Sequence, residues 1–392
     1  MEELLTRGVD QIVGLPELEQ ALDGSRALRI KFGVDPTRPD LHIGHAVALR
    51  KLRKFQDLGH TVIFLIGDYT TKIGDPSGKS KTRPMLSDDE IAAHVETYLA
   101  QVGQILDVKK AEIRYNSEWL AKLTFGDLIG LASNISVAQI IERDDFKNRL
   151  ENGQELALHE LLYPLMQAYD SVALEADVEF GGTDQLFNLL AGRALQKKLG
   201  QKPQIVFTCE LLVGLDGVKK MSKSLDNYVG FTDTPVDMYG KIMSLPDSLI
   251  APYYKLCTEI PLNVIDELVK TLAVGANPRD AKASLAREVV RLFHGEDAAL
   301  KAESGWNATF RDKLGPTKDM VKTIMVGARP GSLIDFLVEH NLKSSRTGVR
   351  QLISQQGIRL NGETVTDESV ELKIGDEINI GKTEFITLAH NK

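Results

Sequence analysis

The chain has 392 residues, enough for two or three domains and a sizeable core. Its hydrophobic fraction of 43% and charged fraction of 26% are those of an ordinary soluble globular protein, and no apolar run is long enough to cross a bilayer. The net charge of −8 disfavours nucleic-acid binding by the surface as a whole, so we expect any RNA contact to come from local basic patches.

The N-terminus is acidic and lacks the basic region and the apolar stretch of a signal peptide. The two cysteines, Cys209 and Cys257, have no nearby partner in the sequence, which argues against a disulfide framework or a zinc site. We therefore expect a cytoplasmic protein with no membrane partner and no protein-built metal site.

The first half of the chain alternates between strand-like and helix-like segments. A helix is expected from about His42, with apolar residues at helical spacing and Gly59 as its end. A second helix is expected from about residue 183. The expected strands are residues 28–34, 61–66, 178–182 and 204–207. This alternation predicts an α/β fold whose first domain is a Rossmann-like, doubly wound parallel sheet.

From about residue 231 the pattern becomes helical. Asn277 and Pro278 suit an N-cap and a first helical turn, and Gly295 suits the end of that helix. The Pro and Gly content of residues 328–332 indicates a linker. Beyond it we expect a small α+β module with two helices and short strands near residues 358, 371 and 377. The predicted domains are residues 1–230, 231–328 and 331–392.

The small module carries a local basic face. Between residues 340 and 362 there are four basic residues and no acidic ones: Lys343, Arg346, Arg350 and Arg359. Such a face suits RNA phosphates, with salt-dependent affinity. The alternative is a solvated charged helix without a partner.

The first motif is residues 36–45, with the sequence PTRPDLHIGH. His42 and His45 share one helix face, at an N-terminal end whose free N–H groups and partial positive charge suit phosphate. Two imidazoles and the Thr37 hydroxyl can stabilise the charge that grows on an α-phosphate under attack. Gly44 leaves room for adenine against the backbone. The alternative is a helix start with two ordinary histidines.

The second motif is residues 220–224, with the sequence KMSKS, after a glycine-containing turn. Lys220 and Lys223 can neutralise charge as pyrophosphate leaves, and Ser222 and Ser224 can donate hydrogen bonds. The alternative is an exposed basic loop.

Residues 74–80, with the sequence GDPSGKS, only look like a phosphate-binding P-loop. A P-loop has four residues between its glycines, whereas this segment has three. The segment also follows a complete βαβ unit rather than a first strand. We therefore exclude a P-loop ATPase.

The two motifs together are the signature pair of class I aminoacyl-tRNA synthetases, and the chain resembles the bacterial tyrosyl-tRNA synthetases over nearly its whole length. The matching segments are residues 33–37, 73–79, 163–170, 181–185 and 220–224. The resemblance implies activation of L-tyrosine with ATP to tyrosyl-adenylate and pyrophosphate, then transfer of tyrosine to tRNA(Tyr). It also implies Mg²⁺ carried by the nucleotide, a homodimer, a helical domain that holds the anticodon region, and a C-terminal RNA-binding fold shared with a small-subunit ribosomal protein.

The resemblance assigns roles by motif position. Asp170 accepts a hydrogen bond from the substrate phenol, Asp184 lies near the ribose, and Lys79 and Arg83 lie near the pyrophosphate and the tRNA. The implied tyrosine site is Lys31, Gly33, Asp35, Asp75, Tyr163, Gln167, Asp170 and Gln185. The implied ATP site is Asp35, Thr37, His42, Gly44, His45, Asp184, Lys220, Met221, Ser222 and Lys223. The implied catalytic residues are Thr37, His42, His45, Lys79, Arg83, Lys220 and Lys223.

The tyrosine site also makes sense from the residues themselves. Tyr163, Gln167 and Asp170 have i, i+4, i+7 spacing and share a helix face, yet Gln and Asp do not belong in a core without partners. Phenylalanine would leave the buried carboxylate unpaired, which excludes it without an editing site; tyrosyl-tRNA synthetase is itself the standard example of this selectivity.

One residue departs from the better-known branch of the family. Lys31 stands where that branch has a tyrosine that helps bind the substrate hydroxyl. Two arrangements remain open from the sequence: Lys31 pairs with Asp170, or it points away as a charge at the strand end.

Three other protein classes share part of this pattern. Tryptophanyl-tRNA synthetase has the same fold, but Asp170, the Asp-Gln at 184–185 and the C-terminal module argue against it. A synthetase-derived RNA-binding protein that has lost catalysis would not need intact His42, His45 and both motif lysines. A nucleotidyltransferase of cofactor synthesis shares the His-x-Gly-His pattern but does not need an RNA-binding module.

Overall fold

The computed structural model describes residues 2–37, 40–76, 87–312, 314–327, 330–340, 342–343, 345–381 and 384–390. The chain forms two compact units, residues 1–232 with 245–278 and residues 233–244 with 279–392. This division does not coincide with the three predicted domains, whose boundaries stay a prediction. None of the described helices is both long and apolar enough to span a membrane.

The first unit contains a mixed sheet that is parallel except at one edge. Its strands are β1 (Val9–Val13), β2 (Arg29–Val34), β3 (Thr61–Ile66), β4 (Glu112–Tyr115), β5 (Val178–Gly182) and β6 (Ile205–Cys209). Their order is β1-β6-β5-β2-β3-β4, with β1 antiparallel to β6 and the others parallel. Strands β3 and β6 are almost entirely buried, as their apolar sequences predict.

The strand order places a topological switch point between β2 and β5. From β2 the chain continues to β3 and β4 on one side, and then crosses to β5 and β6 on the other. In open parallel sheets the crevice at the carboxyl ends of two such strands is where ligands bind. The loops after β2, β3, β4 and β5 are therefore the segments that can build a site.

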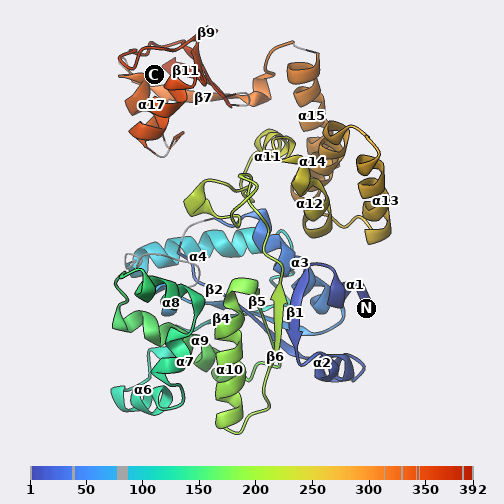
Figure 1. The fold of residues 1–392 in the computed structure, drawn as a ribbon, viewed down its shortest axis with the longest axis vertical. Coiled ribbons are helices and arrows are strands. Elements are labelled where there is room, and N and C mark those ends of the chain that lie inside the picture. The colour runs from blue at the N-terminus through green and yellow to red at the C-terminus, as the bar shows by residue number, and fades with distance from the viewer. Residues whose placement is uncertain are drawn as a thin grey trace. The chain divides into compact units, whose positions relative to one another are not determined.

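Helices cover this sheet (Figure 1). The helices of the first unit are α1 (Glu2–Thr6), α2 (Leu15–Leu22), α3 (Ile43–Asp57), α4 (Asp88–Val102), α5 (Ser117–Leu120), α6 (Phe125–Ala132), α7 (Val137–Ile141), α8 (Asp144–Glu151), α9 (Leu158–Ala173), α10 (Leu186–Lys198), α12 (Ile250–Cys257) and α13 (Leu262–Ala273). Helix α3 follows β2 directly and buries its apolar face, including Leu49, Leu52 and Phe55. Short 3-10 turns also matter for the site: η1 (Thr70–Lys72), η2 (Thr183–Gln185) and η3 (Lys223–Leu225).

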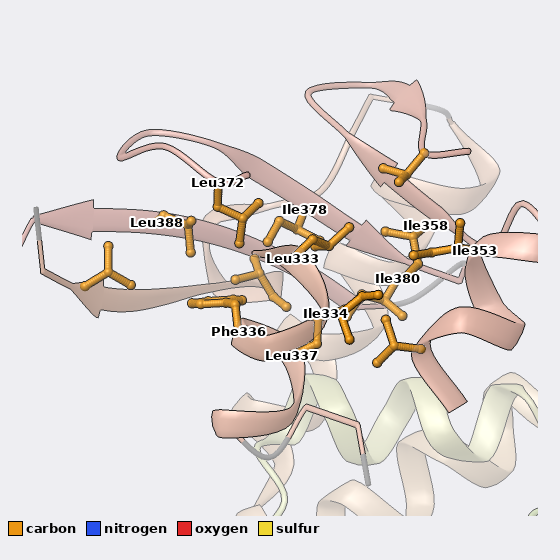
Figure 2. Packing of buried hydrophobic residues seen from close by; sticks show 14 residues of the cluster. Leu333, Ile334, Phe336, Leu337, Ile353, Ile358, Leu372, Ile378, Ile380 and Leu388 are labelled. Atoms are coloured by element: carbon orange, nitrogen blue, oxygen red, sulfur yellow. The ribbon is translucent and has the colours of Figure 1, made fainter. Parts of the chain in front are cut away.

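The second unit combines helices with a separate sheet. Its elements are α11 (Pro235–Met243), α14 (Pro278–His294), α15 (Glu296–Trp306), β7 (Val321–Val326), α16 (Leu333–Glu339), α17 (Arg346–Ser354), β8 (Ile358–Leu360), β9 (Glu363–Thr364), β10 (Glu377–Ile380) and β11 (Glu384–His390). The sheet order is β7-β11-β10-β8-β9. Figure 2 shows its core, in which Leu333, Phe336 and Leu337 of α16 pack with Ile378 and Leu388 of the sheet.

The predicted fold class is confirmed, with local differences. The predicted strands appear as β2, β3, β5 and β6, but β1 and β4 were not predicted. The segment expected to be helical up to residue 328 contains β7, which pairs in parallel with β11. The strand expected near residue 371 is only an isolated bridge between Glu371 and Ser332. These segments are short, and their pairing partners lie far away in the sequence, so local pattern gives little signal for them.

Candidate active site

A cavity of about 700 Å³ opens at the carboxyl ends of the parallel strands, at the switch point between β2 and β5. Most of the predicted site residues line it. They are Lys31, Gly33, Asp35, Thr37, His42, Gly44, His45, Asp75, Tyr163, Gln167, Asp170, Asp184, Gln185, Lys220, Met221, Ser222 and Lys223. Lys79 and Arg83 lie outside the described residues. The structure thus brings segments that are far apart in sequence around one space, while their individual roles stay predictions.

Asp170 is a buried carboxylate, only 3% exposed, that lines this cavity. Its Oδ1 accepts a hydrogen bond from Trp119 Nε1 at 2.8 Å, and its Oδ2 accepts one from Asn116 Nδ2 at 3.3 Å. Burial raises the pKa of Asp170 to about 6, although Lys31 and these two donors act in the opposite direction. At neutral pH the group is therefore a carboxylate that still has lone pairs for a donor in the cavity.

A chain of hydrogen bonds connects Asp170 with Asp35. Asn116 also donates to Thr70 Oγ1 at 2.9 Å, and Thr70 donates to Asp35 Oδ1 at 2.8 Å. Tyr163 donates its hydroxyl to Asp35 Oδ2 at 2.9 Å. This chain fixes the side chains that follow β2, β3 and β4 relative to α9, because each polar group holds the next.

A second chain of hydrogen bonds leads to Asp75. Gln185 Nε2 donates to Asp75 Oδ2 at 2.8 Å, and Asn188 Nδ2 donates to Gln185 Oε1 at 3.0 Å. Arg143 in turn donates to Asn188 Oδ1 at 2.9 Å. Arg143 is itself only 6% exposed, and its guanidinium lies over the ring of Phe146. A buried cation therefore supports the side of the cavity where Asp75 lies.

Lys31 adopts neither of the two arrangements left open by the sequence. Its side chain is fully buried rather than turned away, and its Nζ pairs with Glu179 Oε1 at 2.8 Å, not with Asp170. Lys31 and Glu179 are register neighbours on the adjacent parallel strands β2 and β5. The sheet register therefore brings the two charges together, which the sequence of either strand alone does not reveal.

His42 and His45 stand at the start of α3, as predicted. Their rings lie 3.9 Å apart between centroids, and the His42 backbone N–H donates to His45 Nδ1 at 3.2 Å. The same Nδ1 lies 3.2 Å from the His42 carbonyl oxygen, so whether it accepts or donates is set by the tautomer of the ring. Burial lowers the pKa of His42 to about 2 and that of His45 to about 4, so both rings are neutral at physiological pH. Neutral imidazoles can donate hydrogen bonds to phosphate without the cost of a buried charge.

The lysines of the second motif are both held by carboxylates. Lys220 Nζ pairs with Asp184 Oδ2 at 2.6 Å, and Lys223 pairs with Asp40 of the first motif. Asn227 stabilises the loop of the second motif, because its Oδ1 accepts from the Ser222 backbone N–H and its Nδ2 donates to the Lys220 carbonyl. The two motifs, far apart in the sequence, are therefore in direct contact.

The predicted RNA-binding residues belong to the second unit. Lys343 pairs with Glu384 at 2.9 Å, Arg346 with Asp335 at 2.7 Å and Arg350 with Glu368 at 2.9 Å, whereas Arg359 is exposed on β8. Pairs at the solvent-accessible surface contribute only about 0–1 kcal/mol each, so a phosphate can displace the carboxylate at little cost.

Sequence reasoning missed several residues that line the cavity or contact its lining. Asn116 and Thr70 connect the site, Trp119 holds Asp170, and His94 lines the cavity with its Nδ1 2.8 Å from the Pro36 carbonyl oxygen. The position of Asn116 directly after β4 would have been a signal, because β4 belongs to the same parallel sheet. That strand was not predicted, so the signal was not available.

Comparison with known proteins finds two matching family models and many similar relatives. The family model "tRNA synthetases class I (W and Y)" matches residues 23–311, and the S4 domain model matches residues 333–378. The chain is 47% identical to a tyrosine–tRNA ligase of Thermotoga maritima, over 99% of this chain and 96% of the relative. It is 48% identical to a tyrosine–tRNA ligase of Haemophilus influenzae, with the same coverage.

Solved structures agree in fold. A C-terminally truncated mitochondrial tyrosyl-tRNA synthetase of Aspergillus nidulans superposes with a TM-score of 0.64 at 26% identity, covering 79% of this chain and 93% of that one. A tyrosyl-tRNA synthetase of Archaeoglobus fulgidus, complexed with L-tyrosine, superposes with a TM-score of 0.62 at 23% identity, covering 77% and 98%. The second similarity supports the fold alone.

Proposed function

The chain belongs to the class I synthetases for tryptophan and tyrosine, and within them to the tyrosine–tRNA ligases; from this premise we propose how its cavity carries out the reaction. The carboxylate of L-tyrosine attacks the α-phosphorus of ATP, the bond to the β-phosphate breaks, and tyrosyl-adenylate and pyrophosphate form. A ribose hydroxyl at the 3′ end of tRNA(Tyr) then attacks the carbonyl carbon, and AMP leaves.

The amino acid binds in the inner part of the cavity. The observation that carries this assignment is Asp170, a buried carboxylate whose protein donors leave room for one more hydrogen bond, from the substrate phenol. Gln167 Oε1 is buried and has no hydrogen-bond partner among the described residues, which suits the substrate ammonium. Asp75 and Tyr163 complete that ammonium site.

The nucleotide binds between the two motifs. His42, His45 and Thr37 donate to the α-phosphate, where charge grows during attack, and Gly44 leaves space for adenine. The ion pairs of Lys220 and Lys223 are exchanged when the nucleotide enters: each lysine turns from its carboxylate to the phosphates, and Asp184 becomes available to the ribose. Lys79 and Arg83, outside the described residues, stay proposed partners of the pyrophosphate and the tRNA.

Mg²⁺ enters with the nucleotide. Among the described residues, no group of three or more His, Cys, Asp or Glu side chains could hold a metal ion. We therefore assign no step to the ion and propose that it is held by the phosphate oxygens and water.

The C-terminal module binds tRNA. Its match to the S4 domain model, the exposed side chains of Arg346, Arg350 and Arg359, and the partly exposed Lys343 support contact with tRNA phosphates. The reaction takes place in the cytoplasm, where a reducing environment suits the free, buried Cys209 and Cys257.

The protein works as a homodimer. Large apolar side chains are exposed on the helices α6, α7 and α9, which pack together in the first unit: Phe125 is 78% exposed, Val137 63% and Leu158 76%. Apolar surface gathered in this way marks protein contacts. Sedimentation analysis should find a dimer, and a charged residue at Phe125 should weaken it; a wild-type monomer at all concentrations would refute the assembly.

The experiment that tests the activity is amino-acid-dependent exchange of labelled pyrophosphate into ATP, with all twenty amino acids and without tRNA. Exchange with tyrosine alone is expected. Exchange with tryptophan would mean that the motifs are correctly assigned but the amino-acid pocket is not. No exchange with any amino acid would refute the catalytic assignment and favour an RNA-binding descendant of the family.

A further inference from the structure

Lys31 lies beneath the tyrosine pocket with its ammonium group fully enclosed. Besides the ion pair with Glu179, its Nζ donates to Ser171 Oγ at 2.8 Å and to the Gln167 carbonyl at 3.1 Å. Its side chain has 0% relative exposure, and Lys31 also lines the cavity. One buried cation therefore connects strand β2 with two positions of α9, and one of them, Gln167, belongs to the ammonium site.

Glu179, on the neighbouring strand β5, accepts hydrogen bonds from the same helix. Its Oε1 accepts from Gln167 Nε2 at 3.2 Å, and its Oε2 accepts from Ser171 Oγ at 2.8 Å and from Gln204 Nε2. The surroundings are closely packed: a Cβ added at Gly192 would lie 2.7 Å from Gln204 Nε2 and 3.2 Å from Glu179 Oε2. Glu179 thus holds the side-chain nitrogen of Gln167, and the side-chain oxygen remains available to accept a hydrogen bond from a ligand in the cavity.

The pair also acts on Asp170 by charge. Lys31, from β2, stabilises the ionised form of Asp170, and Glu179, from β5, destabilises it. The groups from the segment after β4, Asn116 and Trp119, are neutral donors. On α9 itself, burial raises the pKa of Tyr163 well above its ordinary value, so this phenol stays neutral. Lys31 and Glu179 are therefore the ionic groups among those acting on Asp170, and their effects have opposite signs.

We propose that Lys31 and Glu179 are positioning residues for the amino acid, which fix α9 through Gln167 and Ser171 and set, with opposite signs, the strength of Asp170 as acceptor for the phenol. Both residues act through α9 and Asp170, because their side chains are only 0% and 1% exposed. A buried ion pair contributes little net free energy to folding, and its presence alone does not indicate a role in substrate binding. Here, however, the pair contacts the helix that carries three of the residues assigned to the substrate. The inference rests on the proposed function, because it concerns the pocket assigned to tyrosine.

The two charges should change how tyrosine affinity depends on pH, which a purely structural role would not do. A carboxylate is a stronger acceptor than a neutral carboxylic acid, so tyrosine affinity should fall as pH is lowered through the pKa of Asp170. Removing the positive charge should move this midpoint to higher pH, and removing the negative charge should move it to lower pH. Each shift should be on the order of one pH unit for a buried charge that acts on Asp170 inside the protein.

The experiment measures the dissociation constant of labelled L-tyrosine by equilibrium dialysis, without ATP, from about pH 5 to 8.5. The variants are Lys31→Met, Glu179→Gln and the double variant. The matched control is Lys51→Met, which removes another buried lysine of the same unit that donates to the Leu4 carbonyl and does not line the cavity. We expect a higher midpoint for Lys31→Met, a lower one for Glu179→Gln, and the wild-type midpoint for the control.

Lys31→Met leaves Glu179 buried without its cation, and if this variant fails to fold, the double variant takes its place in the comparison. The double variant and Glu179→Gln then differ only in the charge at Lys31, and the double variant should have the higher midpoint. Equal midpoints, or shifts in the same direction for both single variants, would overturn the inference while leaving the tyrosine site intact. A wild-type protein that does not bind tyrosine at any pH would instead refute the proposed function.

Discussion

Replacement of Asp170 by asparagine is the most direct test of the amino-acid pocket. The substitution keeps the shape but turns one acceptor into a donor. The carboxylate now accepts from Trp119 at 2.8 Å and from Asn116 at 3.3 Å. If the new carbonyl accepts from Trp119, the new NH₂ faces the Asn116 NH₂, and the substrate phenol must turn to accept rather than donate. Tyrosine then loses its charge-assisted hydrogen bond, and a buried donor is left unsatisfied.

The size of the effect follows from those two losses. A hydrogen bond to a charged group is worth about 1.5–3 kcal/mol, and an unsatisfied buried donor costs about 1–3 kcal/mol. Together they predict a loss of roughly 3–5 kcal/mol of transition-state stabilisation, which corresponds to a kcat/KM for tyrosine that is lower by about two to four orders of magnitude. Phenylalanine makes no such bond and should lose nothing, so the preference for tyrosine over phenylalanine should fall by about the same factor.

The assay is pyrophosphate exchange with tyrosine and with phenylalanine, supported by a thermal unfolding curve of each variant. Asp177→Asn is the matched control, because Asp177 is a partly buried carboxylate that pairs with Arg26 and does not line the cavity. An equal loss for both amino acids would indicate damage to the fold rather than to phenol recognition. Unchanged tyrosine activation would refute the assignment of Asp170.

The other predictions concern the nucleotide, the ammonium site and the tRNA. His45→Asn and Lys223→Met should each lower kcat for activation by about 10²-fold while leaving the tyrosine dissociation constant unchanged, because their partners are phosphates; weaker tyrosine binding would contradict this in a direct binding assay. Asn188→Ala separates Arg143 from the Asp75 side of the cavity, so KM for tyrosine should rise about tenfold with KM for ATP unchanged; a parallel rise in both would argue against a local effect. Arg359→Ala should weaken tRNA binding and reduce the slope of log affinity against log salt by about one, without changing pyrophosphate exchange; an unchanged slope in a filter-binding titration would remove this residue from the RNA contact.

The sequence pattern predicts those elements whose stability depends on neighbouring residues, such as helices. The helix that carries Tyr163, Gln167 and Asp170 was recognised because 3.6-residue periodicity places these positions on one face, and α9 has them all lining the cavity. The start of α3 at His42 and Ile43 was recognised for the same kind of reason. Strands β7 and β11 are not predicted from the sequence, because their stability comes from pairing with each other rather than from their own residues.

Partners across the fold were not predictable in this way. Tyr163 donates to Asp35, Lys220 pairs with Asp184, and Lys223 pairs with Asp40, in each case between residues of different motifs. The resemblance to known synthetases grouped these residues around one substrate but did not reveal which of them contact each other. The distances between them follow from how the strands and loops are assembled.

The sequence by itself determined the reaction class, the α/β fold and the residues of the two motifs and of α9 that line the cavity, because motifs, periodicity and residue chemistry are written along the chain. Only the tertiary structure decided what Lys31 does. Its partner Glu179 lies on another strand, and the parallel register of β2 and β5 is what brings the two charges together. A charge buried by the fold must find its counter-charge there, and which one it finds depends on strand order and register, which no local segment specifies.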